Sequence, residues 1–277
     1  MINKSILITG CSSGIGFATA IALKERGYQV IASCRKEEDA QRLISLGLDT
    51  VILDVSNSDS IQTAFKEVLA KTEGCLDVLI NNAGYGQAGA LEDIRRDVLR
   101  KQFETNVFGL LELSNLAIPI MRQQGHGRII NISSILGIIS LPFRGAYNAS
   151  KYAVEGLSDT LRLELRPSGI DVVTIEPGPV ESRFRDNCID DSLNALDMKN
   201  SYFNDQYQKM LSTYKETVND SWFTKKPDAV IKKVIHAIES RRPKAKYPVT
   251  IPAHALIFLK RILSTKMLDR LLSKEVP

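Results

Sequence analysis

The chain has 277 residues, of which 44% are hydrophobic and 25% are charged, and its formal net charge is +4. Such a composition is typical of a soluble globular protein with a sizeable core. It excludes a collagen-like or disordered chain, because the 17 glycines and 10 prolines follow no period. The charge is too mild to predict binding of nucleic acid.

The three histidines and four cysteines are far apart in the sequence, without a C-x-x-C or H-x-x-x-H pair. This spacing predicts no metal site and no disulfide framework, and it favours free thiols in a reducing cytoplasm. An uncharged run over residues 5–23 is long enough for a signal peptide or an anchor. Residues 9–14 interrupt it with small and polar side chains, so we expect a soluble, cytoplasmic chain without a cleaved leader.

Short apolar runs alternate along the chain with longer segments of helical periodicity. The runs predict strands at 5–9, 29–33, 50–54, 77–81, 128–133 and 171–176, with a seventh at 247–250. The periodic segments predict helices at 15–26, 36–46, 58–71, 95–122 and 147–165. Strand–helix alternation with near-continuous apolar strands predicts an α/β fold, a doubly wound parallel sheet between two layers of helices.

We expect one domain over residues 1–250 and a C-terminal extension over 251–277. Within the domain, the aromatic-rich segment 183–226 is typical of a cover over a substrate, the alternative being a pair of surface helices. In the extension, apolar residues recur at helical spacing over 255–272. Residues 260–275 include five basic and two acidic residues, a local excess of positive charge. Such an amphipathic helix can lie on a membrane as a peripheral contact. The alternative is packing against its own domain or a second subunit.

A glycine-rich turn joins the first predicted strand to the first predicted helix. Gly10 permits a tight turn, Gly14 lets the backbone approach a pyrophosphate, and Gly16 allows the helix to pack closely on the strand. The helix N-terminus then offers free N–H groups to the anion. The spacing G-x-x-x-G-x-G, placed directly after a strand, predicts a dinucleotide site.

The charge at the end of the second strand distinguishes NAD from NADP. A site for NAD normally has Asp or Glu there, to bind the ribose 2′-hydroxyl. Here Arg35 follows the strand, and the acids Glu37 and Glu38 come later. Arg35 can pair with a 2′-phosphate, and Ser13 can add a hydroxyl, so we expect NADP(H) as the cofactor. The alternative for Arg35 is a solvated charge in a loop.

Tyr147 and Lys151 are one helical turn apart, on one face of a predicted helix. A tyrosine with a pKa of about 10 is a poor base, but a nearby ammonium group favours the phenolate. Ser134, thirteen residues before Tyr147, follows the fifth strand at the end where ligands of α/β sheets bind. Asn106 stands in an otherwise apolar helical segment and needs buried partners or water.

Together these motifs resemble the short-chain dehydrogenase/reductase family over about residues 4–182. The family's glycine motif corresponds to residues 9–16, its structural motif to 81–84 and the motif after its sixth strand to 177–180. Its active-site tetrad corresponds to Asn106, Ser134, Tyr147 and Lys151. The resemblance implies a single-domain Rossmann fold with C-terminal helices that cover the substrate. The cofactor motifs resemble the NADP(H)-dependent branch with 17β-hydroxysteroid dehydrogenases, retinol dehydrogenases and bacterial aldehyde reductases.

The resemblance also implies a role for each residue. Ser134 would bind the substrate oxygen, Tyr147 would transfer the proton, Lys151 would lower the pKa of Tyr147 and hold the ribose, and Asn106 would hold a relay water. Ser133 is an alternative to Ser134, which the thirteen-residue spacing favours. Many members have Thr at the position of Ser182. The cofactor contacts implied are Gly10, Ser12, Ser13, Gly14, Ile15, Gly16, Arg35, Asp54, Val55, Asn81, Ala83, Gly84, Tyr147, Lys151, Pro177, Gly178, Val180 and Ser182.

The expected substrate is a small hydrophobic carbonyl or alcohol, such as an aldehyde, a retinoid or a steroid. Its predicted contacts, besides Ser134 and Tyr147, are the apolar Leu136, Leu141 and Phe143. The expected function is an NADP(H)-dependent carbonyl reductase or alcohol dehydrogenase. A non-catalytic NADP(H)-sensing protein and an epimerase or dehydratase on the same fold stay open as alternatives. The resemblance further implies a dimer or tetramer formed through the helices at 95–122 and 147–165.

Overall fold

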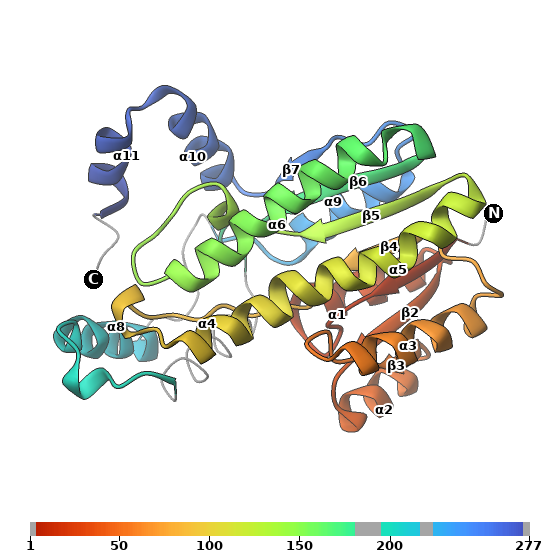
Figure 1. Ribbon diagram of the computed structural model, residues 1–277, viewed down its shortest axis with the longest axis horizontal. Helices are drawn as coiled ribbons and strands as arrows, with labels where there is room; N and C mark the ends of the chain where they lie inside the picture. Colours follow the sequence, from red (N-terminus) through yellow and green to blue (C-terminus); the bar gives the residue numbers. More distant parts are fainter. Residues whose placement is uncertain (1–3, 181–194, 217–223, 274–277) are drawn as a thin grey trace.

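The computed structural model describes residues 4–180, 195–216 and 224–273, and over 211–216 the backbone alone. A seven-stranded sheet lies at the centre of the molecule (Figure 1), in the order β3-β2-β1-β4-β5-β6-β7. Every neighbouring pair is parallel. The strands are β1 (Ser5–Ile8), β2 (Gln29–Cys34), β3 (Asp49–Ile52), β4 (Val78–Asn81), β5 (Gly127–Ile132), β6 (Ile170–Glu176) and β7 (Lys246–Pro248). The predicted doubly wound parallel sheet is confirmed.

Helices cover both faces of this sheet. In β1, Ile6 and Ile8 pack against the helices of one face and Leu7 against those of the other, and all three are fully buried. Successive strand side chains point to opposite faces, so an uninterrupted apolar strand belongs between two layers. One layer is α1 (Gly14–Glu25), α2 (Glu37–Ser45) and α9 (Asp228–Glu239). The other, in front in Figure 1, is α3 (Ser58–Lys71), α5 (Gly109–Gln124) and α6 (Gly145–Glu164).

The helix predicted over 95–122 is confirmed, since the backbone is helical from Arg96 to Gln124, but it contains an irregularity that was not predicted. Helices α4 (Arg96–Phe103) and α5 are joined by a π-helical turn, η2 (Glu104–Phe108). A π turn inserts one residue into the helix and is frequent at functional sites. At the start of α5, a Cβ on Gly109 would overlap the carbonyl group of Val55, so the loop after β3 requires a glycine there.

The single helix predicted over 255–272 is wrong, since two helices occupy the segment: α10 (Ile251–Ile262) and α11 (Thr265–Leu272). The hydroxyl of Thr250 caps α10 by accepting a hydrogen bond from the Ala253 N–H at 3.3 Å. Before α10, the predicted cover contributes α8 (Asn204–Glu216) and the 3₁₀ turn η5 (Met198–Asn200). No helix in the described ranges is long and apolar enough to cross a membrane.

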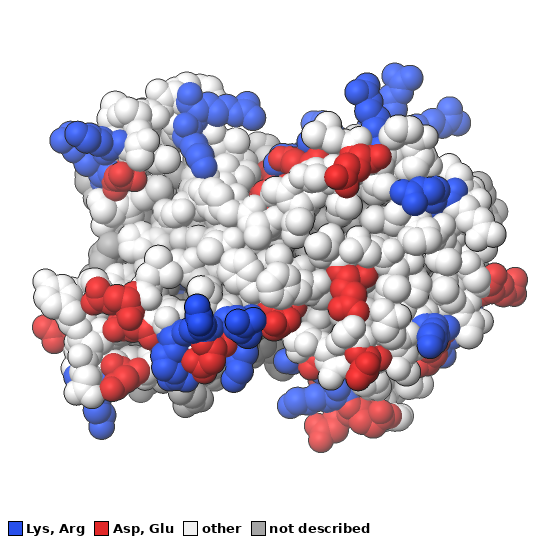
Figure 2. Space-filling model, viewed as in Figure 1, with Lys and Arg blue, Asp and Glu red and all other residues white. Residues whose placement is uncertain are grey.

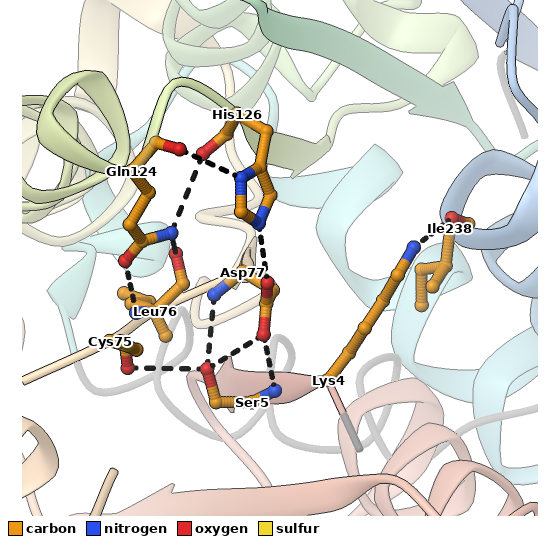
Figure 3. A network of polar contacts seen from close by, with 8 residues as sticks. All are labelled: Lys4, Ser5, Cys75, Leu76, Asp77, Gln124, His126 and Ile238. Carbon is orange, nitrogen blue, oxygen red and sulfur yellow. Dashed lines mark hydrogen bonds and ion pairs between the residues drawn. The ribbon is translucent and has the colours of Figure 1, made fainter. Parts of the chain in front are cut away.

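Polar side chains tie together the amino ends of β1, β4 and β5 (Figure 3). Asp77 accepts hydrogen bonds from the N–H of Ser5 at 2.8 Å and from its hydroxyl at 3.1 Å, and its other oxygen lies 2.9 Å from Nε2 of His126. Gln124 accepts from the N–H of Leu76 at 2.8 Å. This end of the sheet is therefore held by its own side chains, and the predicted site lies at the opposite, carboxyl end.

Candidate active site

The predicted tetrad residues come from elements that pack together near the carboxyl end of β5. Ser134 follows β5, Tyr147 and Lys151 lie on α6, and Asn106 lies in the π turn η2. Helix α6 packs against η2 and against the 3₁₀ turn η3 (Ile135–Gly137) that follows Ser134. All four side chains belong to buried residues. The fold thus gathers an amide, a hydroxyl, a phenol and an ammonium group in one region of low solvent access.

Lys151 lies beside the ring of Tyr147. Its Nζ lies 5.8 Å from the centre of the Tyr147 ring and donates a hydrogen bond to the carbonyl oxygen of Ile132 at 2.7 Å. Burial lowers the pKa of Lys151 to about 8, against the opposing effect of the Glu155 carboxyl group one turn further along α6. An amine with this pKa is still mostly protonated at neutral pH, so a buried positive charge lies beside the Tyr147 ring.

Asn106 ties the π turn to the loop after β4. Its Oδ1 accepts a hydrogen bond from the N–H of Tyr85 at 3.1 Å, and its Nδ2 donates to the carbonyl oxygen of Tyr85 at 2.9 Å. The same Nδ2 donates to the hydroxyl of Ser150 at 3.1 Å, and Ser150 in turn donates to the carbonyl oxygen of Tyr147 at 2.8 Å. The side chain therefore positions α6, whereas the relay water that the family resemblance assigns to Asn106 stays a prediction.

Ser134 and Ser133 occupy different surroundings. Ser134 is extended, and its hydroxyl accepts from the N–H of Leu136 at 3.1 Å and donates to the carbonyl oxygen of Pro177 at 3.5 Å. That donation is long and leaves the hydroxyl proton easily redirected to a substrate oxygen. The hydroxyl of Ser133 is buried without a partner among the described residues, and a Cβ on Gly137 would lie 3.0 Å from it. Ser133 therefore lies beneath η3.

The glycine turn after β1 packs closely on the loop after β4. Gly10 and Gly14 have φ of +72° and +59°, in the left-handed region that favours glycine. A Cβ on Gly16 would overlap the Asn82 side chain, whose Nδ2 donates to the carbonyl oxygens of Thr9 at 2.9 Å and Gly10 at 3.1 Å. The Thr9 hydroxyl also accepts from the N–H of Asn82 at 2.9 Å. Thr9 and Asn82 were not among the predicted site residues, although they hold the two loops together.

The first turn of α1 fits a pyrophosphate. Ser13, before the helix, makes no capping hydrogen bond with its side chain, and the first turn carries no acidic residue. The N–H groups of Ile15 and Gly16 have no partner within the helix, because the first turn of any helix lacks them. Arg42 of α2, which forms an ion pair with Asp39 at 3.2 Å, lies beside the turn. Its guanidinium donates to the carbonyl oxygen of Ser12 and lies 5.4 Å from the centre of the Phe17 ring.

Arg35 and Asp54 follow the ends of the adjacent strands β2 and β3. Arg35 is exposed, and its guanidinium makes no hydrogen bond or ion pair with any residue of the described chain. Asp54 uses Oδ1 to accept from the N–H of Ser56 at 2.9 Å and from its hydroxyl at 2.7 Å, which orders the loop that also contains Val55. The position directly after β2 therefore carries an exposed guanidinium and no carboxylate.

Asn81 has its side chain directed away from the expected cofactor. Its Nδ2 donates to the hydroxyl of Ser114 at 3.0 Å and to Oδ1 of Asn131 at 2.9 Å, in a buried network between the sheet and the helices in front of it. The backbone of Asn81, together with Ala83 and Gly84, is therefore the part of this loop that can contact the expected cofactor. A Cβ on Gly84 would lie 3.0 Å from Oδ1 of Asn106, so the loop runs directly against the π turn.

The segment after β6 is fixed from two sides. The carbonyl oxygen of Pro177 accepts from the N–H of Ile135 at 2.9 Å, and a Cβ on Gly178 would overlap the hydroxyl of Thr250. Val180 forms a parallel bridge with Lys225. Ser182, the predicted contact of the nicotinamide, lies outside the described residues.

Comparison with known proteins agrees with this arrangement. A family model described as short chain dehydrogenase matches residues 4–192. The chain belongs to the short-chain dehydrogenase family. It is 43% identical to the uncharacterized oxidoreductase YbbO of Escherichia coli K12 over 98% of this chain and 95% of YbbO. It is 36% identical to 3-ketodihydrosphingosine reductase of Bacteroides thetaiotaomicron, over 85% and 84% of the two chains. It is 31% identical to human 17-beta-hydroxysteroid dehydrogenase type 1, over 90% and 78%.

Solved structures show the same fold. A short-chain dehydrogenase from Streptomyces avermitilis superposes with a TM-score of 0.77 at 28% identity, covering 97% of this chain and 93% of that one. The closed form of serine dehydrogenase complexed with NADP⁺ superposes with a TM-score of 0.74 at 25% identity, covering 89% and 94%. The predicted family is confirmed, and this short-chain dehydrogenase is an oxidoreductase that uses a nicotinamide dinucleotide, NAD(P)(H).

The predicted substrate contacts of this dehydrogenase pack against two different segments of the chain, the C-terminal helices and the region of α8. Leu136 and Leu141 pack in an apolar cluster with α10 and α11. Phe143 instead contacts the segment before and within α8, with its ring centre 5.3 Å from that of Phe203 and 5.9 Å from that of Tyr207. Phe143 has a φ of +56°, which is strained for a bulky residue. The loop from β5 to α6 is thus held between the C-terminal helices and α8.

Tyr207 anchors α8 over this loop. Its hydroxyl donates to a carboxyl oxygen of Asp93 at 2.6 Å and accepts from the N–H of Ala90 at 2.8 Å. Burial raises the pKa of Tyr207 to about 12, and the hydrogen bond to Asp93 adds to the rise. The tyrosine stays protonated at all physiological pH values, so the anchor does not depend on pH there. The sequence marked this segment as aromatic-rich without indicating which tyrosine would hold it.

Proposed function

We propose that this protein is an NADP(H)-dependent dehydrogenase or reductase acting on a hydrophobic carbonyl or alcohol. The observation that carries the proposal is the buried ammonium group of Lys151 beside the Tyr147 ring, 5.8 Å from its centre, next to the segment that begins at Ser134. A buried, positively charged neighbour is what a tyrosine needs to exchange a proton at neutral pH.

The protein's residues divide the chemistry among them. When bound, NADP(H) supplies or accepts the hydride at the substrate carbon. In the direction of reduction, Tyr147 donates its hydroxyl proton to the substrate oxygen, and Lys151 stabilises the phenolate that remains. The hydroxyl of Ser134 donates a hydrogen bond to the same oxygen, which holds the substrate and offsets the charge that develops there. Oxidation of an alcohol runs through the same contacts in reverse.

A preference for NADP(H) over NAD(H) is supported by charge. Arg35 is exposed and unpaired within the described chain at the end of β2, where an NAD site would carry a carboxylate. Arg42 places a second guanidinium beside the glycine turn, although it also forms an ion pair with Asp39 at 3.2 Å. One of the two solved structures with this fold, the closed form of serine dehydrogenase, is named as a complex with NADP⁺.

A hydrophobic substrate is supported by the lining and by the relatives. Leu136, Leu141 and Phe143 belong to the segment after Ser134, and each is only partly buried. Two relatives are named for 3-ketodihydrosphingosine and for 17β-hydroxysteroids. We therefore expect ketones and aldehydes with long or fused apolar groups to be turned over faster than polar carbonyl compounds.

A turnover assay with a matched variant tests this proposal. Purified protein is given NADPH and a panel of aldehydes and ketones of increasing chain length, and loss of NADPH absorbance is followed for the wild type and for Tyr147→Phe. We expect turnover by the wild type and a loss of at least 100-fold in the variant, within the usual size of an acid–base contribution of about 10²–10⁴. NADPH binding should be retained in the variant.

Two other outcomes would assign the alternatives. Tight NADPH binding without turnover of any compound would indicate a dinucleotide sensor. Product formation without net consumption of NADPH would indicate an epimerase or a dehydratase that recycles its cofactor.

A further inference from the structure

The C-terminal helices carry a stripe of exposed apolar side chains. We define the C-terminal patch as Ile251, Phe258 and Ile262 of α10 with Met267 and Leu271 of α11, whose exposed fractions range from 42% to 61%. The three positions on α10 are seven and four residues apart, so they lie along one side of the helix. Five of the thirteen large apolar residues exposed in the described chain are in these two short helices.

The other side of the same helices is already packed on the domain. Ala253 and Leu272 are buried with Ile135 and Ile139 of the segment after β5, and Leu256, Ile257 and Leu268 pack against them. The domain therefore uses one apolar side of α10 and α11, and the C-terminal patch is a second apolar side. A helix that is apolar on two sides requires a second partner to bury the outer one.

Unpaired basic side chains border the patch. Arg261, Lys266 and Arg270 are exposed and form no ion pair within the described residues, and Asp269 is the one acid between them. Lys260 is different, because its Nζ donates hydrogen bonds to the Ile138 carbonyl oxygen and to the Tyr152 hydroxyl. In Figure 2, blue side chains flank the pale surface over α10 and α11.

We propose that the C-terminal patch docks on the surface of an anionic membrane. The apolar stripe lies in the interface between headgroups and acyl chains, and Arg261, Lys266 and Arg270 face the negatively charged headgroups. A second copy of the chain fits less well, because a two-fold contact of the patch with itself would bring the same basic side chains together. Neither helix is able to cross the bilayer, so the protein lies on the membrane.

Docking would bring the membrane close to the predicted substrate side. The inner side of α10 packs on Ile135 and Leu136, directly after Ser134. A hydrophobic substrate dissolved in the bilayer would then reach the cover of the site without passing through water. This consequence rests on the proposed function, whereas the docking itself does not.

Flotation of the full-length protein with vesicles tests the docking without using turnover. The vesicles are phosphatidylcholine alone or phosphatidylcholine with phosphatidylserine. The variants are an apolar pair, Phe258→Ser with Ile262→Ser, and a charge triple, Arg261→Gln with Lys266→Gln and Arg270→Gln. The matched controls make the same kinds of change at exposed positions elsewhere: Ile44→Ser with Leu46→Ser, and Arg241→Gln with Arg242→Gln.

We expect the wild type and both controls to float with the anionic vesicles, more strongly than with phosphatidylcholine alone. Each basic residue near such a surface contributes about fivefold to partitioning, so the charge triple should lose on the order of 100-fold. The apolar pair should remain at the bottom with both kinds of vesicle, while its thermal unfolding stays that of the wild type.

Three results would overturn the proposal. The wild type could fail to float with anionic vesicles, or the patch variants could float as well as the controls. In the third, light scattering would show that the apolar pair lowers the mass of the wild-type assembly, which would make the patch a contact between subunits.

Discussion

Replacing Glu176 with Gln should stabilise the folded protein above pH 7 and leave its stability at low pH unchanged. Glu176 ends β6 and is 1% exposed. Burial raises the pKa of its carboxyl group from 4.5 to about 7, and the nearby carboxyl group of Glu155 adds to the rise. The hydroxyl of Thr174 is within 3.4 Å of one oxygen, and Lys246, which opposes the rise, lies 2.7 Å from Glu155.

The direction of the effect follows from these pKa values. A carboxyl group with a raised pKa in the folded state contributes stability at low pH, and this is lost as the pH rises from 4.5 to about 7. One pKa unit corresponds to about 1.4 kcal/mol, so the full loss is about 3 kcal/mol above pH 7. Glutamine has nearly the same shape and cannot ionise, so the variant should keep the stability that the wild type loses.

Urea unfolding of both proteins at about pH 5 and about pH 8 measures this difference. Glu38→Gln, at an exposed site on α2, is the matched control and should unfold like the wild type at both pH values. The reasoning would be refuted if Glu176→Gln changed the free energy of unfolding by the same amount at both pH values. It would also be refuted if the variant were less stable than the wild type at the higher pH.

Three further predictions concern the site and the assembly. Asn106→Ala removes every hydrogen bond of that buried side chain, so it should cost about 1–3 kcal/mol in urea unfolding and lower kcat far more than NADPH affinity. An unchanged kcat would contradict its positioning role. Tyr207→Phe removes the bond to Asp93 and should raise KM for apolar substrates without changing the Kd for NADPH; a weaker Kd alone would place α8 over the cofactor instead. Phe108→Asp puts a charge on a side chain that is 49% exposed at the expected subunit contact, so light scattering should report a smaller assembly, and an unchanged mass would exclude that contact.

The sheet was predictable because its central strands are buried on both faces. Ile6, Leu7 and Ile8 have no exposed surface, so their apolar run was unbroken in the sequence. The glycine turn was predictable for a related reason, since Gly10 and Gly16 lie where another backbone or side chain leaves no room for a Cβ. Both signals are local, and each reflects one dominant physical constraint.

The π turn and the break between α10 and α11 were not predictable. The backbone stays helical on both sides of residues 104–108, and the π turn differs from its neighbours in its hydrogen-bond pattern, which the order of apolar residues does not reveal. Ser264, the residue before α11, separates the apolar stripe of α10 from that of α11. A single polar residue between two apolar stripes does not predict a break between helices. The contact of Arg42 with Ser12 was not predictable either, because it depends on how α2 packs against the glycine turn and not on neighbouring residues in the sequence.

The most direct test of an NADP(H)-dependent dehydrogenase is a fluorescence titration with NADPH and with NADH, for the wild type and for Arg35→Asp. We predict that the wild type binds NADPH at least tenfold more tightly than NADH, because a charge-assisted contact to the 2′-phosphate contributes about 1.5–3 kcal/mol. The variant should lose this difference and bind NADH no more weakly than the wild type does. Equal or tighter binding of NADH by the wild type would contradict the account.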